Sequence, residues 1–232
     1  MSRLITRFAA GLAAAAAVLT LTALPASADA STDPAATKLT AQASSTRVDA
    51  GTPVTITGRL TSAAKPVAGV TVGIAYCTDD FCGEFDAQPV TDANGRYRAT
   101  VTPVRSGHYR ADFLPADETL APADASTAGI VVIQPAEFTS FTATRAADGT
   151  ITASGTLGFP RFTPPAIPVR IEYLTAGARC WTTAATVEAQ WTGTAFGFSA
   201  SAQLPGAGVW RAVYAGVPDQ FHPAASQAVF VR

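Results

Sequence analysis

The sequence predicts an all-β protein: two tandem antiparallel β-sandwiches after an N-terminal signal peptide. Three observations lead to this prediction. Apolar and polar residues alternate at a period of two, and several blocks of sequence recur about 100 residues apart. No segment after the first 30 residues combines helical periodicity with helix caps. Alternation at a period of two is typical of strands that bury one face and expose the other.

The first 30 residues have the layout of a secretory signal peptide. Arg3 and Arg7 precede an apolar run over residues 8–24, and Pro25 and two overlapping Ala-x-Ala cleavage sites follow it. The run is close to the shortest length that spans a membrane, so an uncleaved anchor is the alternative, but the small residues at its end favour cleavage. We therefore expect a secreted, extracellular protein with no membrane segment after cleavage.

Three blocks of sequence occur in the same order in both halves of the remaining chain. The pairs are residues 54–60 and 151–157, residues 66–72 and 165–171, and residues 107–113 and 208–214. Partners lie 97 to 101 residues apart, a drift that small loop changes explain, and this pattern indicates a duplication. We expect a flexible lead-in at residues 31–36, a first domain at residues 37–134 and a second at residues 136–232.

Each repeat contains short segments that fit half-buried strands. Val54, Ile56 and Leu60 share one face of a segment whose other face is polar, and residues 70–76 are expected to bury every second side chain in the same way. The residues at 92–95 (DANG) favour a tight turn, because Asn and Gly adopt positive φ at low cost. Turn signals at this spacing predict about seven strands in each domain, the number typical of a sandwich.

Several of these motifs resemble the bacterial immunoglobulin-like repeat domains of secreted and surface proteins. They are TGRL at 57–60, PVAGVTV at 66–72, TDANGRY at 91–97 and GHYRA at 107–111, and residues 214–226 are similar to the last two strands of such repeats. The second copy departs from the pattern, with Trp191-Thr192-Gly193 in place of the DANG turn. The resemblance implies two immunoglobulin-like sandwiches. It implies no activity, because function depends on sites added to such folds.

The charge balance argues against nucleic acid as a partner. The chain has 16 basic and 17 acidic residues and a formal net charge of -1. Proteins that bind nucleic acid need a basic surface to neutralise phosphates. We therefore expect no nucleic-acid partner.

The three cysteines predict one disulfide and one free thiol. Cys77 and Cys82 flank four residues between two expected strands, and a tight reversal would place them opposite each other. Opposed residues of an antiparallel pair have Cα atoms about 4.5–5.5 Å apart, which a disulfide accepts. Cys180 follows Cys82 by 98 residues, but Thr175 occupies the position that matches Cys77. Since an exported protein meets an oxidising compartment, we expect a Cys77–Cys82 disulfide and an unpaired Cys180.

No catalytic residues are predicted. His108 and His222, the two histidines, do not occupy matching positions in the repeats, and no Gly-x-Ser-x-Gly motif occurs. Two histidines far apart in sequence and the absence of Cys-rich spacing give no zinc ligand set. We therefore expect a protein that is not an enzyme and that has no cofactor and no metal site.

An acidic segment around the expected disulfide is the one place where calcium binding stays open as an alternative. The residues concerned are Asp79, Asp80, Glu84 and Asp86. Calcium prefers clustered oxygen ligands, but the spacing matches no calcium-binding loop. A solvated acidic turn is the favoured interpretation.

A Pro- and Phe-rich loop at residues 158–168 is the candidate partner-binding segment. It replaces a smaller loop at residues 62–66 of the first repeat. Its candidate contact residues are Phe159, Arg161, Phe162, Pro164 and Pro165. Prolines reduce the entropy lost on binding, and aromatic residues commonly anchor interfaces. The favoured alternative is that the Phe side chains cover the end of their own sandwich.

The sequence therefore favours a secreted, non-catalytic binding or structural module that acts through its loops or faces. Its partner would be an extracellular protein or a cell-envelope polysaccharide. The alternative function is a carbohydrate- or cell-envelope-binding protein that uses exposed aromatic residues. Trp181, Trp191 and Trp210 are interpreted first as core or flanking residues, and Trp210 aligns with Tyr109.

Overall fold

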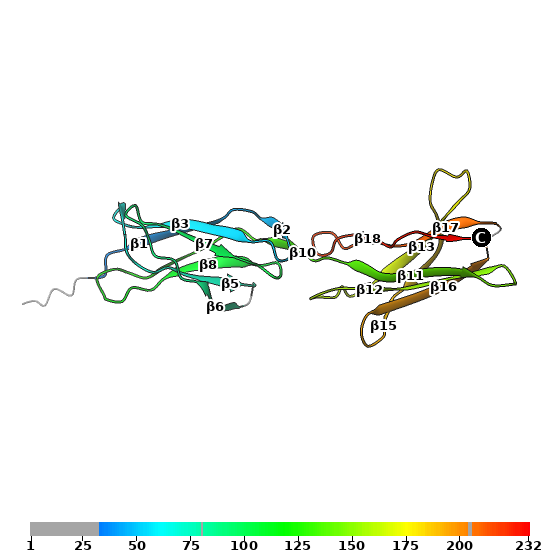
Figure 1. Ribbon diagram of the computed structural model, residues 1–232. Coiled ribbons are helices and arrows are strands. Elements are labelled where there is room, and N and C mark those ends of the chain that lie inside the picture. The colour runs from blue at the N-terminus through cyan, green and yellow to red at the C-terminus, as the bar shows by residue number, and fades with distance from the viewer. Residues whose placement is uncertain (1–32, 80, 204–205) are drawn as a thin grey trace, which may run out of the picture. The chain divides into compact units, whose positions relative to one another are not determined.

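The computed structural model describes residues 33–79, 81–203 and 206–232, so the signal peptide expected at residues 1–30 lies outside the described part of the chain. In these ranges every regular element is a β-strand (Figure 1). Neighbouring strands pair in antiparallel fashion, except in one short parallel pair. This confirms the all-β class. A search of the same residues found no helix with the length and hydropathy needed to cross a membrane.

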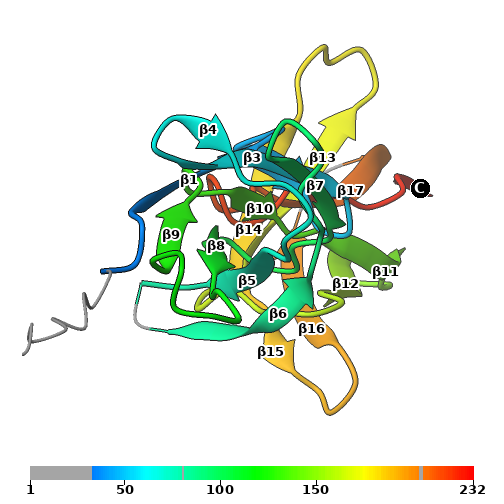
Figure 2. The same ribbon diagram turned by 90° about the vertical axis from the view of Figure 1, so that its left-hand side faces the viewer.

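The strands of the N-terminal half form two four-stranded sheets and one short parallel pair. They are β1 (Thr37–Ala43), β2 (Arg47–Asp49), β3 (Val54–Ser62), β4 (Lys65–Pro66), β5 (Gly73–Cys77), β6 (Cys82–Ala87), β7 (Arg96–Val101), β8 (His108–Phe113), β9 (Ala123–Ser126) and β10 (Val131–Ile133). In one sheet β3 lies between β1 and β7 and also pairs with β4; the other has the order β6-β5-β8-β9 (Figure 2). The β2–β10 pair is parallel, and the sequence did not predict it.

The strands of the C-terminal half form one sheet of four strands and one of five. They are β11 (Glu137–Arg145), β12 (Thr150–Gly158), β13 (Pro168–Thr175), β14 (Thr182–Glu188), β15 (Gln190–Trp191), β16 (Phe196–Gln203), β17 (Gly208–Tyr214), β18 (Ala224–Ala225) and β19 (Val229–Val231). One sheet has the order β11-β12-β16-β15. In the other, β13 lies between β14 and β17, and β17 also pairs with β18 and β19.

Each half buries its own apolar cluster between its two main sheets. In the N-terminal half, Ile56 and Leu60 of β3 and Ile74 of β5 are fully buried in one cluster. In the C-terminal half, Leu157 of β12 and Val169 of β13 are fully buried in a second cluster. Two antiparallel sheets that face each other across an apolar layer are the immunoglobulin-like sandwich arrangement, so the predicted fold is confirmed. The domain boundaries at residues 134 and 136 stay a prediction.

The aromatic residues that the repeat aligned occupy matching places in the two cores. Tyr109 and Trp210 are 1% and 2% exposed, as expected from the alignment. Tyr109 lies opposite Tyr76 in the β5–β8 pair, and Trp210 lies opposite Tyr173 in the β13–β17 pair. Both pairs bring their rings close, with centroids 5.8 Å and 5.5 Å apart.

A glycine and an aromatic ring pair across strands in both halves. Gly58 of β3 lies directly opposite Tyr97 of β7, and Gly155 of β12 lies directly opposite Phe198 of β16. A Cβ atom at either glycine would overlap the ring of its partner and a backbone carbonyl. Glycine is therefore required at both positions because the ring lies over its backbone.

The predicted alternation fails in one segment. Residues 70–76 were expected to bury every second side chain, but Gly73, Ile74 and Ala75 are all buried. The reason is that the ring of Phe85, from the neighbouring β6, packs against Gly73 on the face expected to meet water. A paired edge strand thus covers the second face of β5.

Two buried tyrosines provide a matched test of hydrogen bonding in the cores. Burial raises the pKa of both hydroxyls, so each stays protonated near neutral pH. The Tyr97 hydroxyl donates to the Thr40 carbonyl at 2.6 Å, whereas among the described residues the Tyr214 hydroxyl has no partner. We expect Tyr97→Phe to lower the unfolding free energy by about 1 kcal/mol and Tyr214→Phe to leave it unchanged or raise it, measured by urea denaturation. Equal losses would contradict this assignment.

Candidate functional site

A groove of about 370 Å³ lies beside the β15–β16 hairpin of the C-terminal half. Three segments line it: the start of β11 with Pro135 before it, the end of β12 with the two residues after it, and the hairpin. The lining residues are Pro135, Glu137, Thr139, Gly158, Phe159, Pro160, Trp191, Thr194 and Phe196. Its walls therefore combine aromatic rings with one carboxylate and two hydroxyl groups.

The hairpin presents Trp191 to solvent. Trp191 of β15 lies directly opposite Phe196 of β16, and their ring centroids are 5.2 Å apart. The Thr192 backbone N–H donates to the Ala195 carbonyl at 2.9 Å, and Gly193 has a φ of 100°, which closes the turn between them. The indole is nevertheless 60% exposed, so most of one large aromatic surface remains open at the groove.

Phe159 anchors the inner wall of the groove. Its ring packs edge-on against Phe196, Tyr214 and Phe221, with centroid distances of 5.5 to 5.8 Å. Trp191, Phe196 and Phe159 thus form a chain of contacting rings that runs from the exposed hairpin to the apolar cluster. The exposed indole is therefore connected through two partly buried rings to the apolar cluster.

The chemistry of this groove suits a sugar ring. An indole offers a flat apolar surface that can stack on the C–H face of a sugar. The Glu137 carboxylate can accept hydrogen bonds from sugar hydroxyls, and the Thr139 and Thr194 hydroxyls can donate or accept them. A mostly apolar groove with few polar groups is the usual form of a small-ligand site.

The structure divides the predicted partner-binding loop between the core and the surface. Phe159 is partly buried and packs against the core cluster, and Pro164 is buried, as the packing alternative expects. Arg161 and Pro165 are exposed, and Phe162 is 39% exposed. Of these five residues, only Phe159 lines the groove. A binding role for the exposed residues stays a prediction.

The three tryptophans have different environments. Trp210 is buried in the core, and Trp181 lies beneath the Arg211 guanidinium, which is 4.1 Å from its ring centroid. Trp191 is the exception to the interpretation as core or flanking residues, because it is exposed and lines the groove. The signal in the sequence was the Trp191-Thr192-Gly193 segment, where the second copy departs from the repeat.

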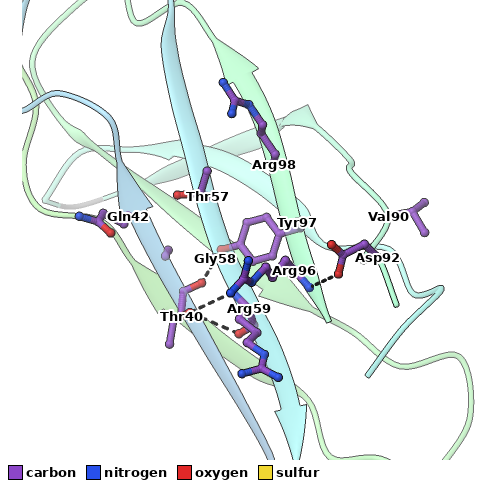
Figure 3. A pocket seen from close by; sticks show the side chains of 11 residues that line it. Thr40, Gln42, Thr57, Gly58, Arg59, Val90, Asp92, Arg96, Tyr97 and Arg98 are labelled. Atoms are coloured by element: carbon purple, nitrogen blue, oxygen red, sulfur yellow. Dashed lines mark hydrogen bonds between the residues drawn. The ribbon is translucent and has the colours of Figure 1, made fainter. Parts of the chain in front are cut away.

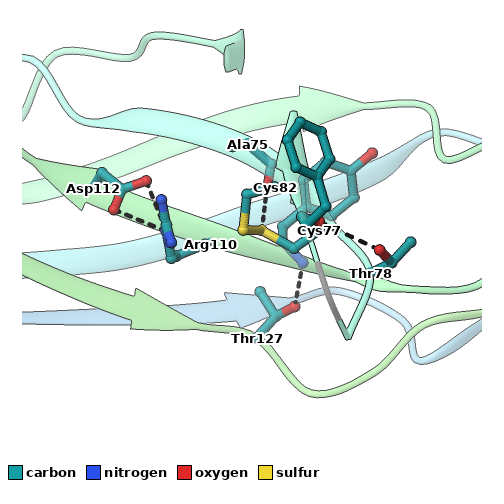
Figure 4. The surroundings of a disulfide bond; sticks show 9 residues. Ala75, Cys77, Thr78, Cys82, Arg110, Asp112 and Thr127 are labelled. Atoms are coloured by element: carbon teal, nitrogen blue, oxygen red, sulfur yellow. Dashed lines mark hydrogen bonds and ion pairs between the residues drawn. A yellow bond between two sulfur atoms is a disulfide. The ribbon is translucent and has the colours of Figure 1, made fainter. Parts of the chain in front are cut away.

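Cys77 and Cys82 form a disulfide in the β5–β6 hairpin (Figure 4). The two residues are directly paired in the strand register, and their Cα atoms are 4.0 Å apart. Cys77 is fully buried on β5, so the disulfide ties the start of β6 to a core strand. Cys180 is exposed and unpaired.

The acidic segment beside the disulfide does not gather into a ligand set in the described part of the chain. Glu84 and Asp86 are exposed on β6, and Asp80 lies outside the described residues. No group of three or more His, Cys, Asp or Glu side chains suited to a metal ion was found among the residues that the structure describes. His108 lies on β8 opposite Cys77 in the strand register.

Comparison with known proteins finds similarity only among solved structures, since no family model and no curated protein matches. The D0–D1 domain of intimin is 17% identical over 84% of this chain and 97% of that chain, with a TM-score of 0.32. The Escherichia coli adhesin FdeC is 14% identical over 84% of this chain and 64% of that chain, with a TM-score of 0.39. A two-domain fibronectin type III segment of chicken tenascin is 10% identical over 82% and 94%, with a TM-score of 0.38.

The disulfide arrangement predicts one titratable thiol per chain. Thiol titration of the unfolded, unreduced protein should count Cys180 alone, because the other two cysteines are bonded to each other. A peptide map should link Cys77 to Cys82. Three free thiols, or a link from Cys180 to either of the others, would contradict the arrangement.

The two Phe residues of the loop should differ in their effect on stability. Phe159→Ala removes a ring that three other aromatic rings contact, and we expect it to lower the unfolding free energy by about 3 kcal/mol. Phe162→Ala removes a partly exposed ring and should cost less than about 1 kcal/mol. Denaturant unfolding of both variants checks this, and the reverse order would refute the assignment of Phe159 to the core.

Proposed function

We propose that this chain is a secreted, non-catalytic binding protein of the cell surface that holds envelope carbohydrate in the groove beside Trp191. The observation that carries the proposal is that Trp191 is 60% exposed and yet contacts the partly buried ring of Phe196 at the wall of a groove. A large exposed ring at the wall of a mostly apolar groove, unlike a single exposed ring elsewhere on the surface, is typical of a ligand-binding site.

The rigidity of the site supports binding. Trp191 lies on a short hairpin that is closed by hydrogen bonds between Thr192 and Ala195, through both the backbone and the Thr192 hydroxyl. A side chain that is already held in position loses little entropy when a ligand covers it. The groove can therefore bind a sugar ring without prior rearrangement of the sheet.

A second candidate is a protein partner bound by the exposed part of the loop at residues 158–168. Phe162 and Arg161 support it, since aromatic and Arg side chains are enriched at the centres of protein interfaces. The two candidates use different residues, so substitutions separate them.

Binding to purified cell-wall polysaccharide should depend on Trp191. We expect Trp191→Ala to weaken binding by about tenfold or more, which corresponds to the roughly 1.4 kcal/mol or more that an aromatic anchor contributes. Co-sedimentation measures the affinity. Intrinsic fluorescence of the unmodified protein should change on binding, because Trp191 is the exposed one among the three tryptophans.

Phe230 offers a matched control within the same half of the chain. It lies on β19, outside the groove, and is 59% exposed. Phe230→Ala should leave polysaccharide binding unchanged, and both variants should retain the melting temperature to within a few degrees. Equal losses for the two variants would refute the groove. If binding of a protein ligand is lost in Phe162→Ala and retained in the other two variants, the second candidate is favoured.

A further inference from the structure

The outward face of the β1–β3–β7 sheet concentrates positive charge. Arg59 of β3 lies directly opposite Arg96 of β7, and Arg98 follows two residues later on the same face. All three side chains are exposed, as is Lys38 on β1. The full chain has a net charge of -1, so four cations on one sheet face are a local excess.

The same face carries a shallow groove of about 870 Å³ (Figure 3). Its lining residues come from β1, β3 and β7 and from the segment before β7. They are Thr40, Ala41, Gln42, Thr57, Gly58, Arg59, Val90, Asp92, Arg96, Tyr97 and Arg98. These side chains form two adjacent rows across β1, β3 and β7. The first row is Thr40, Arg59 and Arg96, and the second is Gln42, Thr57 and Arg98.

These arginines are not neutralised within the part of the chain that the structure describes. None of the ion pairs found there involves Arg59, Arg96 or Arg98. Asp92, the one acidic residue of the groove, accepts the backbone N–H groups of Asn94 and Arg96 and so stabilises its own turn. Like charges directly opposite each other destabilise a sheet, so the Arg59–Arg96 pair has a cost that a ligand would offset.

The second half of the chain provides an internal comparison. When Gly58–Tyr97 is aligned with Gly155–Phe198, Arg59 corresponds to Thr156, Arg96 to Gly197 and Arg98 to Ser199. The equivalent positions of the second half are therefore uncharged. Three arginines are consequently not a requirement of the fold.

We infer that this arginine face binds an anionic polysaccharide whose repeating sugars carry carboxylates. The Arg guanidinium matches a carboxylate in two parallel hydrogen bonds, and Thr57 and Gln42 lie in the row beside Arg59 and Arg96, where they can bind sugar hydroxyls. The Cα atoms of these arginines are about 5 Å apart across the β3–β7 pair and about 7 Å apart along β7, distances comparable to one sugar ring. The inference rests on the proposed function, because it names a second class of envelope carbohydrate for the same protein.

A nucleic acid fits this face less well. Tyr97 is buried, and the face presents no other aromatic ring on which a base could stack. Four cations are also fewer than the roughly six to ten phosphate contacts typical of proteins that bind duplex DNA through its backbone.

The test compares binding of the full mature chain to alginate, neutral dextran and duplex DNA. Alginate should bind and dextran should not bind to this face. The variant Arg59→Thr with Arg98→Ser introduces the residues of the second half at both positions, so it should fold. It should weaken alginate binding by about tenfold, on the order of 1.4 kcal/mol. The difference in alginate affinity between this variant and the unmodified protein should diminish at high salt, because exposed charges are screened.

Two controls separate this inference from general charge and from the groove beside Trp191. Arg179 is exposed in the C-terminal half, and Arg179→Ser should leave alginate binding unchanged while Arg98→Ser weakens it. Trp191→Ala should also retain alginate binding, so failure at one site is distinct from failure at the other. Unchanged alginate affinity in the Arg59→Thr, Arg98→Ser variant, an equal loss of dextran binding in that variant, or tighter binding of duplex DNA would overturn the inference.

Discussion

The packing of an aromatic ring over a cross-strand glycine is the interaction on which one sheet of each half depends. Tyr97 covers Gly58 and Phe198 covers Gly155, and in each case a Cβ atom at the glycine would overlap the ring. The ring fills the space that a glycine leaves in a strand and so offsets the weakness of glycine there. Tyr97 adds a hydrogen bond to the Thr40 carbonyl and thereby ties three strands together.

This inward pairing leaves the outward positions free to vary. The neighbours of the glycine and of the aromatic residue point away from the core, because side chains alternate along a strand. One half of the chain has Arg59 and Arg98 at these positions and the other has Thr156 and Ser199. The same glycine–aromatic pairing can therefore support arginines at these positions in one half of the chain and hydroxyl side chains in the other.

Much of the fold could be predicted from the sequence, because strand faces and repeats are local patterns. The burial of Tyr109 and Trp210 followed from their alignment alone, and the pairing of Cys77 with Cys82 in the register agreed with their spacing. The second buried face of β5 could not be predicted, since it depends on Phe85 from another strand. Both candidate surfaces also escaped prediction: each combines residues that are distant in sequence and meet only through strand pairing.

The exposed Cys180 sets a limit on covalent assembly of this protein. The whole chain contains three cysteines, and two of them are bonded to each other, so each molecule has a single sulfur available for a link to another molecule. A polymer needs at least two connection points per subunit. Oxidation can therefore join two copies, or one copy and a different thiol, and then stops, so that any covalent complex formed through this sulfur contains one bond and two partners.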